Sequence, residues 1–524
     1  MIVCLSALLL GVYLWSSLRM PTLFNSPDET ANFFFAQRVA NGQSLRAPTT
    51  VGQESAPLIH PRSTTVVDGN MVPGSFIGFP ILIGIVGRAF GTVGMISVTP
   101  LAAALSIVVY YFLMREIIGE RGAYFSAILV PLLPAFWYYA SRPMYHNSLF
   151  VSLLVFGFYL MLQMIRRNSV WISVLASLFL SLALWVRTSE APWVIAILVA
   201  VFLAFRHQYS VRSLVSFCLV GALAISALMI SNNIIYGGPF SSAYIPAATS
   251  SGDGAEVATN TLTAFSRAFF PFGFHLAQAF WNFIRYSATL LPFFFILGCA
   301  GLGVAISGAW KRRVRRRTIF FGVLSGVVTA YLILYYGSWE LHEYAKAEKV
   351  ILASSYLRYW LPVLLFGVPF VSYGIIQILQ LLPGLLLKRA LTIFLSVVVV
   401  VTTMQLVYKD PLHGLIRIKQ NLETSVVAQS TLLKHVEPNA LIVSGYADKL
   451  FFPKRNVLVA LPEYPSTSYS ALKNSFLDIP VYYFEEQGDS SDVVSWNRMI
   501  FLRASASLSR FAAYESGVLY RVQL

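Results

Sequence analysis

Long apolar segments recur along the whole chain, and they constrain its fold more than any other feature. About eleven of them approach the roughly 20 residues that a helix needs to cross a bilayer. Their approximate ranges are 2–18, 96–114, 122–140, 148–165, 170–186, 191–205, 213–235, 288–308, 318–337, 358–380 and 389–407. Charged residues make up 12% of the 524 residues, against roughly 25% in soluble domains. The sequence therefore predicts an all-α polytopic membrane bundle of about eleven transmembrane helices.

The net charge of +15 is confined almost entirely to one side of these segments. Alternate short loops, including the KRRVRRR run at 311–317, hold 14 basic and two acidic residues. The opposite loops hold 12 basic and 10 acidic residues, and the tail from 409 holds 12 and 11. The positive-inside rule then predicts a cell-membrane protein with its N-terminus inside and its tail outside. Nucleic-acid binding is excluded as an explanation, because it needs basic residues on one folded surface.

An interfacial helix is predicted just after the first apolar segment. Ser26 suits the N-cap position, Pro27 the first helical turn, and Glu29 completes a capping box. Gly42 suits the position after the helix end. The phenylalanines at 33–35 are expected to lie among lipid headgroups.

The rest of the first outer loop, 19–95, contains a second apolar segment at about 73–88, too short to span and expected at the outer leaflet. With this loop, 1–408 forms the expected membrane domain. The tail, 409–524, alternates apolar strands with helical patterns and is expected to form a small extracytoplasmic α/β domain. The expected strands are 440–444, 456–461, 480–486 and 518–524.

Adjacent acids, Asp28 and Glu29, follow the first apolar segment on the outer side. Asp28 is a candidate general base at the membrane surface. Alternatively, both acids simply complement the dipole of a helix N-terminus. The two interpretations are compatible, since a capped helix start also holds a carboxylate rigidly.

Two short outer turns carry further polar residues. In the first, Arg142, His146 and Asn147 lie at the membrane face, where His146 is a proton acceptor, a metal ligand or an interfacial ring. In the second, Arg187 and Glu190 form either a snorkelling ion pair or a clamp on a lipid phosphate.

A later outer segment contributes Glu340 and His342, followed by Arg358 at the start of an apolar run. An arginine in that place is either an interface anchor or a phosphate contact.

Taken in order, these features resemble the GT-C class of membrane glycosyltransferases, which includes protein O-mannosyltransferases and lipid A aminoarabinose transferases. The resemblance rests on the acidic pair, the interfacial helices, the short turn after YYASR and the late RYWLP. The segment YHNSLFVSLLVFGFYLMLQMIRR and YGGPF followed by FGFH are also similar to members of the class. The resemblance covers about residues 1–408 of the chain.

The resemblance implies a polyprenyl-phosphate sugar donor and a glycan, lipid or protein acceptor, with Asp28 as the catalytic acid and Glu29 as its neighbour. Arg187 or Arg358 would stabilise the leaving phosphate. Members often have an Asp in the second outer turn, where this chain has His146, Asn147 and a serine. This departure argues against a divalent cation, because an Asp–Asp pair would hold one better than Asp with Asn. The sequence does not settle whether a cation binds, and Asp28 and His146 are its candidate ligands.

Two other functions fit a polytopic membrane protein. A transporter or flippase of lipid-linked glycans should show paired broken helices and charges near the middle of the membrane. A polysaccharide polymerase or ligase would place its site on a late outer loop such as 236–287.

The charge distribution makes the topology testable with single cysteines in a cysteine-free variant. In intact cells, an impermeant thiol reagent should leave a cysteine at position 314 unlabelled and should label one at position 423. Strong labelling at 314 would reverse the predicted orientation.

Overall fold

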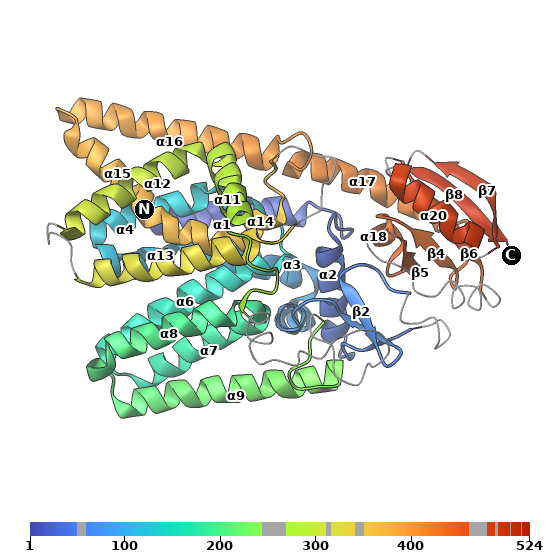
Figure 1. Ribbon diagram of the computed structural model, residues 1–524, viewed down its shortest axis with the longest axis horizontal. Coiled ribbons are helices and arrows are strands. Elements are labelled where there is room, and N and C mark those ends of the chain that lie inside the picture. The colour runs from blue at the N-terminus through green and yellow to red at the C-terminus, as the bar shows by residue number, and fades with distance from the viewer. Residues whose placement is uncertain are drawn as a thin grey trace. The chain divides into compact units, whose positions relative to one another are not determined.

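Helices dominate the structure, a computed structural model that describes residues 1–49, 59–243, 269–310, 316–340, 350–460, 479–487, 491–503, 505–514 and 516–523 (Figure 1). The contacts divide the chain into two compact units. The first comprises Met1–Ser17, Ser97–Ile225 and Gly252–Arg417. The second comprises Leu18–Ile96, Ser226–Ser251 and Ile418–Leu524.

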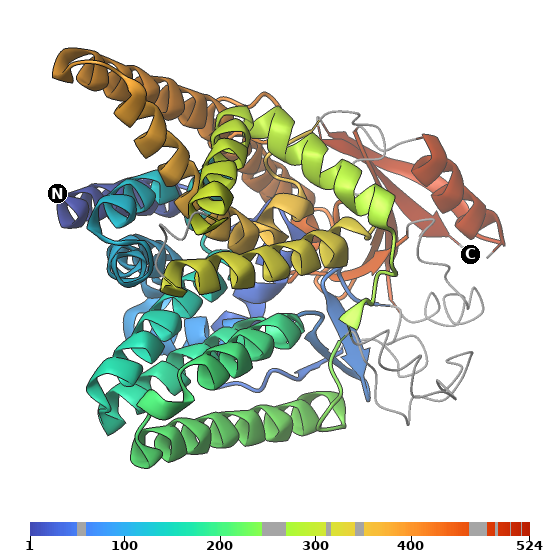
Figure 2. The ribbon, with the colours of Figure 1, turned by 60° about the vertical axis from the view of Figure 1, so that its left-hand side comes forward.

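The first unit is helical, and α6 packs along α7 within it (Figures 1 and 2). Its elements, with α3 and α9 shared with the second unit, are α1 (Ile2–Leu18), α3 (Gly78–Ile118), α4 (Glu120–Leu129), η2 (Val130–Leu132), α5 (Pro134–Ala140), α6 (His146–Arg167), α7 (Val170–Val186), η3 (Thr188–Glu190), α8 (Ala191–Ala204), η4 (Arg206–Gln208), α9 (Val211–Tyr236), α11 (Leu276–Leu290), α12 (Pro292–Trp310), α13 (Arg316–Gly337), α14 (Ser355–Tyr359), α15 (Leu361–Leu381) and α16 (Leu385–Tyr408).

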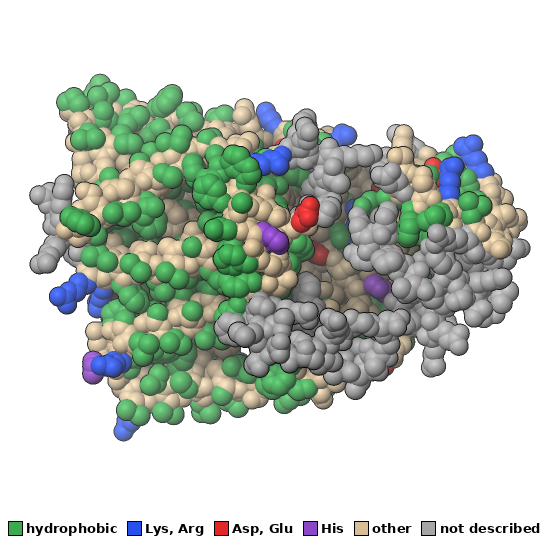
Figure 3. All heavy atoms as spheres, viewed as in Figure 1, with side chains coloured by type: hydrophobic (Ala, Val, Ile, Leu, Met, Phe, Trp, Pro, Cys, Tyr) green, Lys and Arg blue, Asp and Glu red, His purple; other side chains and the backbone are tan. Residues whose placement is uncertain are grey.

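Among the described residues, seven helices are long and apolar enough to cross a membrane, or up to nine if each of two bent pairs is one span. Apolar side chains cover the face of this unit shown in Figure 3, and basic side chains lie at helix ends. The protein is therefore a multi-pass integral membrane protein with seven to nine candidate spans.

The expected eleven spans differ from this count at two places. The 17 residues of α1 are fewer than the other spans have. The helices α7 and α8, expected as two separate spans, form one of the bent pairs, with an angle of 114° between them. The other bent pair, α4 to α5, bends by 60° inside a segment that the sequence treats as one span.

The boundary between the expected second interfacial helix and the span after it lies at Gly91 in α3. Its backbone is left-handed (φ 63°) and breaks the helical geometry of the 41-residue element. No atom would meet a Cβ there, so glycine is needed for the backbone conformation alone.

The second unit contains the tail sheet, whose strand order is β5-β4-β6-β8-β7. β4 is parallel to β5 and β6, and the pairs β6–β8 and β8–β7 are antiparallel. Apolar side chains of α20 pack on one face of the sheet, and those of α17 and α18 pack on the other. The elements are α17 (Leu415–Leu432), β4 (Leu441–Ser444), α18 (Asp448–Phe451), β5 (Asn456–Val459), β6 (Val481–Glu486), α20 (Ser491–Arg503), β7 (Ser507–Tyr514) and β8 (Gly517–Gln523).

The four strands expected in the tail are thus confirmed as β4, β5, β6 and β8. β7 was not expected, because its sequence SLSRFAAY has no continuous run of β-branched and apolar residues, and its side chains are exposed or half-buried. A second, three-stranded antiparallel sheet in this unit has the order β1-β3-β2. Its strands are β1 (Ala47–Pro48), β2 (Thr64–Val67) and β3 (Asn70–Pro73).

The first interfacial helix is present as α2 (Pro27–Ala40), with Ser26 as its N-cap. Gly42 has a left-handed backbone, as expected after a helix end. The phenylalanines of α2, however, pack within the protein and not among lipid headgroups. Phe33 and Phe35 are buried, and the Phe34 ring packs on Phe452 of the tail at 4.8 Å. The protein itself provides the apolar environment that the sequence analysis assigned to the membrane.

Close packing of α12 against α15 depends on glycines. A Cβ at Gly301 would lie 1.7 Å from the Phe370 carbonyl oxygen. Small residues at such crossings allow membrane helices to approach closely.

We expect Gly301→Ala to destabilise the protein by at least ~1–3 kcal/mol, measured as a lower melting temperature in detergent. Gly303→Ala is the matched control, since nothing lies within 4 Å of a Cβ there. Equal melting temperatures for both variants would contradict the close approach.

Candidate functional site

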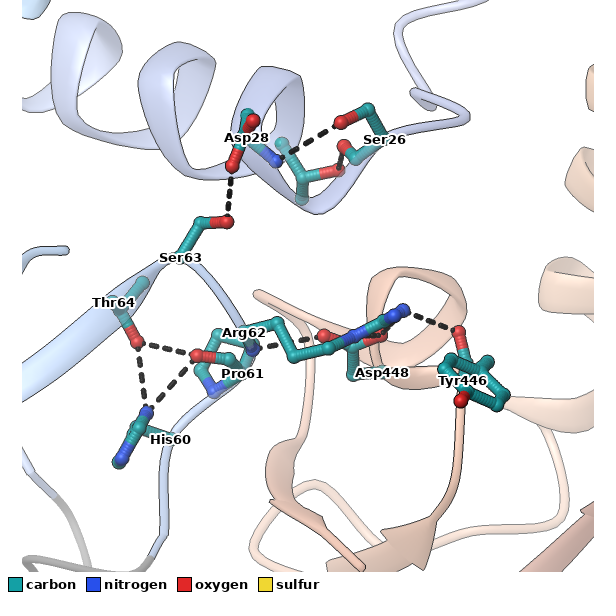
Figure 4. A network of polar contacts seen from close by, with 10 residues as sticks. Ser26, Asp28, His60, Pro61, Arg62, Ser63, Thr64, Tyr446 and Asp448 are labelled. Atoms are coloured by element: carbon teal, nitrogen blue, oxygen red, sulfur yellow. Dashed lines mark hydrogen bonds and ion pairs between the residues drawn. The ribbon is translucent and has the colours of Figure 1, made fainter. Parts of the chain in front are cut away.

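The N-terminus of α2 holds the acidic pair in a fixed position within the second unit. The Ser26 hydroxyl accepts a hydrogen bond from the Asp28 amide at 3.3 Å. The Asp28 carboxylate is half-buried, and its Oδ1 accepts a hydrogen bond of 2.5 Å from the Ser63 hydroxyl. Figure 4 shows Asp28 pointing from the helix toward Ser63. A carboxylate in this place has a defined direction and remains partly accessible.

The expected capping box is only partly correct. Ser26 caps the helix, but its hydroxyl accepts from the amide of Asp28 and not from that of Glu29. Glu29 is 2% exposed, so it lies on the inner face of α2. Glu29 therefore lies inside the protein, whereas Asp28 remains partly accessible.

In the first unit, Arg187 is the centre of a buried polar cluster. Its side chain is 2% exposed and sits between α7 and η3. Nε donates to Glu190 Oε1 at 2.9 Å, and Nη2 donates to the Tyr336 hydroxyl at 2.8 Å. Nη1 lies 2.7 Å from His146 Nε2. Each of the three guanidinium nitrogens therefore contacts a polar side chain of the protein.

Glu190 is held as firmly as the arginine that it neutralises. It accepts hydrogen bonds from the Tyr336 hydroxyl and from Trp193 Nε1, both at 2.5 Å. The sequence alternative of an ion pair is thus confirmed for Arg187 and Glu190. The pair is buried within the protein, not snorkelling at its surface.

Aromatic rings connect this pair to two further arginines. Arg187 and Arg358 both lie over the Tyr359 ring, at 5.0 and 4.9 Å. Arg358 also lies over Tyr145 at 5.2 Å, and Arg142 lies over the same ring at 4.9 Å. Such cation–π contacts hold a guanidinium in place without neutralising it. The printed contacts thus bring the guanidiniums of Arg142, Arg187 and Arg358 together around Tyr145 and Tyr359.

Two other expected site residues, Asn147 and Glu340, lie close to this cluster in space or along the chain. Asn147 donates from Nδ2 to the Arg358 carbonyl at 3.2 Å, which ties the start of α6 to α14. Glu340 follows Trp339, whose ring is stacked at 5.8 Å on Tyr359. His342 lies outside the described residues.

A divalent cation does not fit at His146. An arginine can only donate hydrogen bonds, so Nε2 of His146 is the acceptor of the Arg187 contact. This nitrogen is thus not available to a metal, and the adjacent guanidinium repels a cation. Among the described residues, no group of three or more His, Cys, Asp or Glu could hold a metal ion.

Sequence reasoning missed the tyrosines that frame the cluster: Tyr145, Tyr336 and Tyr359. The available signal was their place in the sequence: Tyr145 precedes His146, Tyr359 follows Arg358, and Tyr336 lies next to an outer segment. It also missed Ser63, for which a neutral hydroxyl in a loop offers no signal at all.

Residues 79–236, from α3 to α9, match the family of dolichyl-phosphate-mannose-protein mannosyltransferases. This segment includes Arg142, His146, Asn147, Arg187 and Glu190. No curated protein matches the chain in sequence.

Solved structures share the fold over nearly the whole chain. ArnT from Cupriavidus metallidurans, bound to undecaprenyl phosphate, is 12% identical with a TM-score of 0.51, and the match covers 99% of this chain and 97% of ArnT. The oligosaccharyltransferase of Archaeoglobus fulgidus, tethered with an acceptor peptide, is 13% identical with a TM-score of 0.55, and the match covers 98% of this chain and 74% of that enzyme.

The shared fold agrees with the resemblance drawn from the residues. Over residues 79–236 the chain is thus similar to dolichyl-phosphate-mannose-protein mannosyltransferases, and over nearly its whole length it has the fold of ArnT and of the archaeal oligosaccharyltransferase.

Proposed function

We propose that the protein transfers a sugar from a polyprenyl-phosphate donor to an acceptor hydroxyl at the outer face of the membrane, by a single inverting displacement with Asp28 as the general base. The observation that carries the proposal is the Asp28 carboxylate, held at the start of α2 by Ser26 and Ser63. A base must be fixed and within reach of the proton that it removes.

The proposed step needs one base and one leaving group. As the acceptor oxygen attacks the anomeric carbon, its proton passes to Asp28. The bond from that carbon to the phosphate oxygen breaks, and the polyprenyl phosphate leaves with the electron pair. Direct displacement by this route inverts the anomeric configuration, since the acceptor attacks from the face opposite the leaving group.

Arg358 is the better candidate for the leaving phosphate. Arg187 is saturated by Glu190, His146 and Tyr336. Arg358 is 8% exposed and is framed by the rings of two tyrosines. A guanidinium that is fixed by aromatic rings can add charge-assisted hydrogen bonds to a phosphate. We assign Arg187 and Glu190 to the support of this frame.

The donor class is supported by the relatives. The matching family is named for dolichyl-phosphate-mannose, and the ArnT structure holds undecaprenyl phosphate. Both carry a polyprenyl phosphate. The acceptor is a glycan, a lipid or a protein hydroxyl. The tail and the first outer loop are placed outside by the charge asymmetry of the loops.

The role of Asp28 predicts a large effect of a small change. Asp28→Asn keeps the shape and removes proton acceptance, so turnover should fall by at least ~10²-fold, measured as sugar transfer in membranes at matched protein levels. Asp68→Asn is the control, because it makes the same chemical change at a carboxylate that is 76% exposed. Full activity of Asp28→Asn would remove the base assignment.

The role of Arg358 predicts a defect in donor use. Arg358→Ala should raise the KM for the lipid donor by ~10-fold or more, the effect of losing a hydrogen bond to a charged group. The exposed Arg285 provides the control variant Arg285→Ala. An unchanged donor KM in Arg358→Ala would make Arg358 an interface anchor only.

A further inference from the structure

The loop before β2 connects the tail to the acidic pair. Ser63 lies in this loop and donates its hydroxyl hydrogen bond to Asp28 Oδ1. The next residue along the loop toward the N-terminus, Arg62, contacts the tail. Figure 4 shows the two contacts side by side, one pointing to α2 and the other to α18. The direction of the Ser63 hydroxyl therefore depends on the contacts that fix the backbone of this loop.

The backbone of Ser63 is in a conformation that its neighbours must maintain. Its φ of 59° lies in the left-handed region, which is unfavourable for a residue with a Cβ. On one side, the Gly74 amide donates to the Ser63 carbonyl at 3.0 Å. A Cβ at Gly74 would lie 2.5 Å from the Ser63 carbonyl carbon, so the two backbones are in close contact. Strained residues persist where the surroundings over-determine them, and they cluster at functional sites.

On the other side, Asp448 of the tail clamps Arg62. Its carboxylate accepts from the Arg62 amide at 2.9 Å, from Nε at 3.1 Å and from Nη2 at 2.6 Å. The carboxylate is 1% exposed and the arginine side chain 16%. The Tyr446 carbonyl accepts from the same Nη2 at 2.8 Å, and the guanidinium lies over the Tyr446 ring. Both the backbone and the side chain of Arg62 are thus fixed by one buried acid.

The neighbouring polar side chains, His60 and Thr64, do not supply the positive charge that pairs with Asp448. Burial lowers the pKa of His60, with smaller opposing effects from the Pro61 carbonyl and from Asp448. His60 is therefore neutral near pH 7, and Arg62 is the cation that balances Asp448. Thr64 donates to the Pro61 carbonyl at 2.7 Å, which closes the turn internally.

The tail also contacts α2 directly. Asp448 begins α18, and Phe452 directly after α18 packs on Phe34 of α2. The same short segment of the tail thus contacts the loop that carries Ser63 and the helix that carries Asp28. These two contacts fix the two ends of the Ser63–Asp28 hydrogen bond.

We propose that Asp448 is a positioning residue for sugar transfer: by clamping Arg62 it holds Ser63 in the conformation that orients the Asp28 carboxylate toward the acceptor. The proposal rests on the proposed role of Asp28 as the base. It gives the tail domain a direct part in the reaction, and no part in binding the donor.

The test compares Ser63→Ala, Asp448→Asn and the double variant of the full chain in membranes. Each single variant should lower kcat ~10-fold, leave the KM for the polyprenyl-phosphate sugar unchanged, and move the acidic limb of the pH–rate profile to higher pH. The shift is expected because a hydrogen bond to a carboxylate favours its charged form. The double variant should be no worse than the more severe single variant, since both changes break one chain of contacts.

The control must separate positioning from the stability of the tail. Tyr482→Phe removes a hydrogen bond of 2.8 Å to Glu437 inside the same domain, without touching Arg62. It should lower the melting temperature and keep the wild-type kcat and pH profile. If Tyr482→Phe reproduces the loss of kcat and the shifted limb, Asp448 acts only through domain stability and the proposal is wrong.

The base assignment of Asp28 and the positioning role of Asp448 can be disproved separately. Full activity of Asp28→Asn would overturn the base assignment and this inference with it. An inactive Asp28→Asn together with an Asp448→Asn variant that has wild-type kcat and pH profile would overturn the positioning role alone. Additive losses in the double variant would do the same.

Discussion

The hydrocarbon core of the bilayer, which accepts neither unpaired charge nor open backbone, is the constraint on which the rest of this structure depends. It limits the spanning segments to helices whose backbone groups are satisfied internally. It also drives ionisable side chains to the helix ends or into complete polar shells. Arg187 shows the second solution, since Glu190, His146 and Tyr336 engage its guanidinium on every side. A chain under this constraint carries its chemistry at the ends of its helices, where a lipid phosphate also lies.

Each compact unit contains one set of the candidate site residues. The helical unit contains a cluster of three guanidiniums, in which the rings of Tyr145 and Tyr359 frame Arg358. The other unit supplies a carboxylate on a capped helix start, together with the tail segment at Asp448 that fixes the loop beside it. The division follows from chemistry. A leaving phosphate needs positive charge beside apolar chains, whereas a base needs a carboxylate held within reach of the acceptor proton.

How much the sequence predicts depends on how far apart the interacting residues are along the chain. Spans, tail strands and the Ser26 cap follow from local periodicity and local hydrogen bonds. The structure confirms the four expected tail strands and the cap, and among the described residues it gives seven to nine candidate spans where eleven were expected. The pairing of Arg62 with Asp448 crosses 386 positions, and no local pattern indicates it. Phe34 was assigned to lipid for the same reason, since its partner Phe452 is as distant. Local physics thus locates the acid and the arginines, but not the contacts that orient them.

The most direct test of the account is the stereochemistry of transfer, because a single displacement with one base has one possible outcome. Purified protein would be given a synthetic polyprenyl-phosphate sugar of defined anomeric configuration together with an acceptor alcohol. The anomeric configuration of the product would be read by nuclear magnetic resonance before any spontaneous equilibration. The account predicts inversion in every transferred sugar. Retention would require two successive displacements through a covalent intermediate, and it would contradict Asp28 as the sole general base.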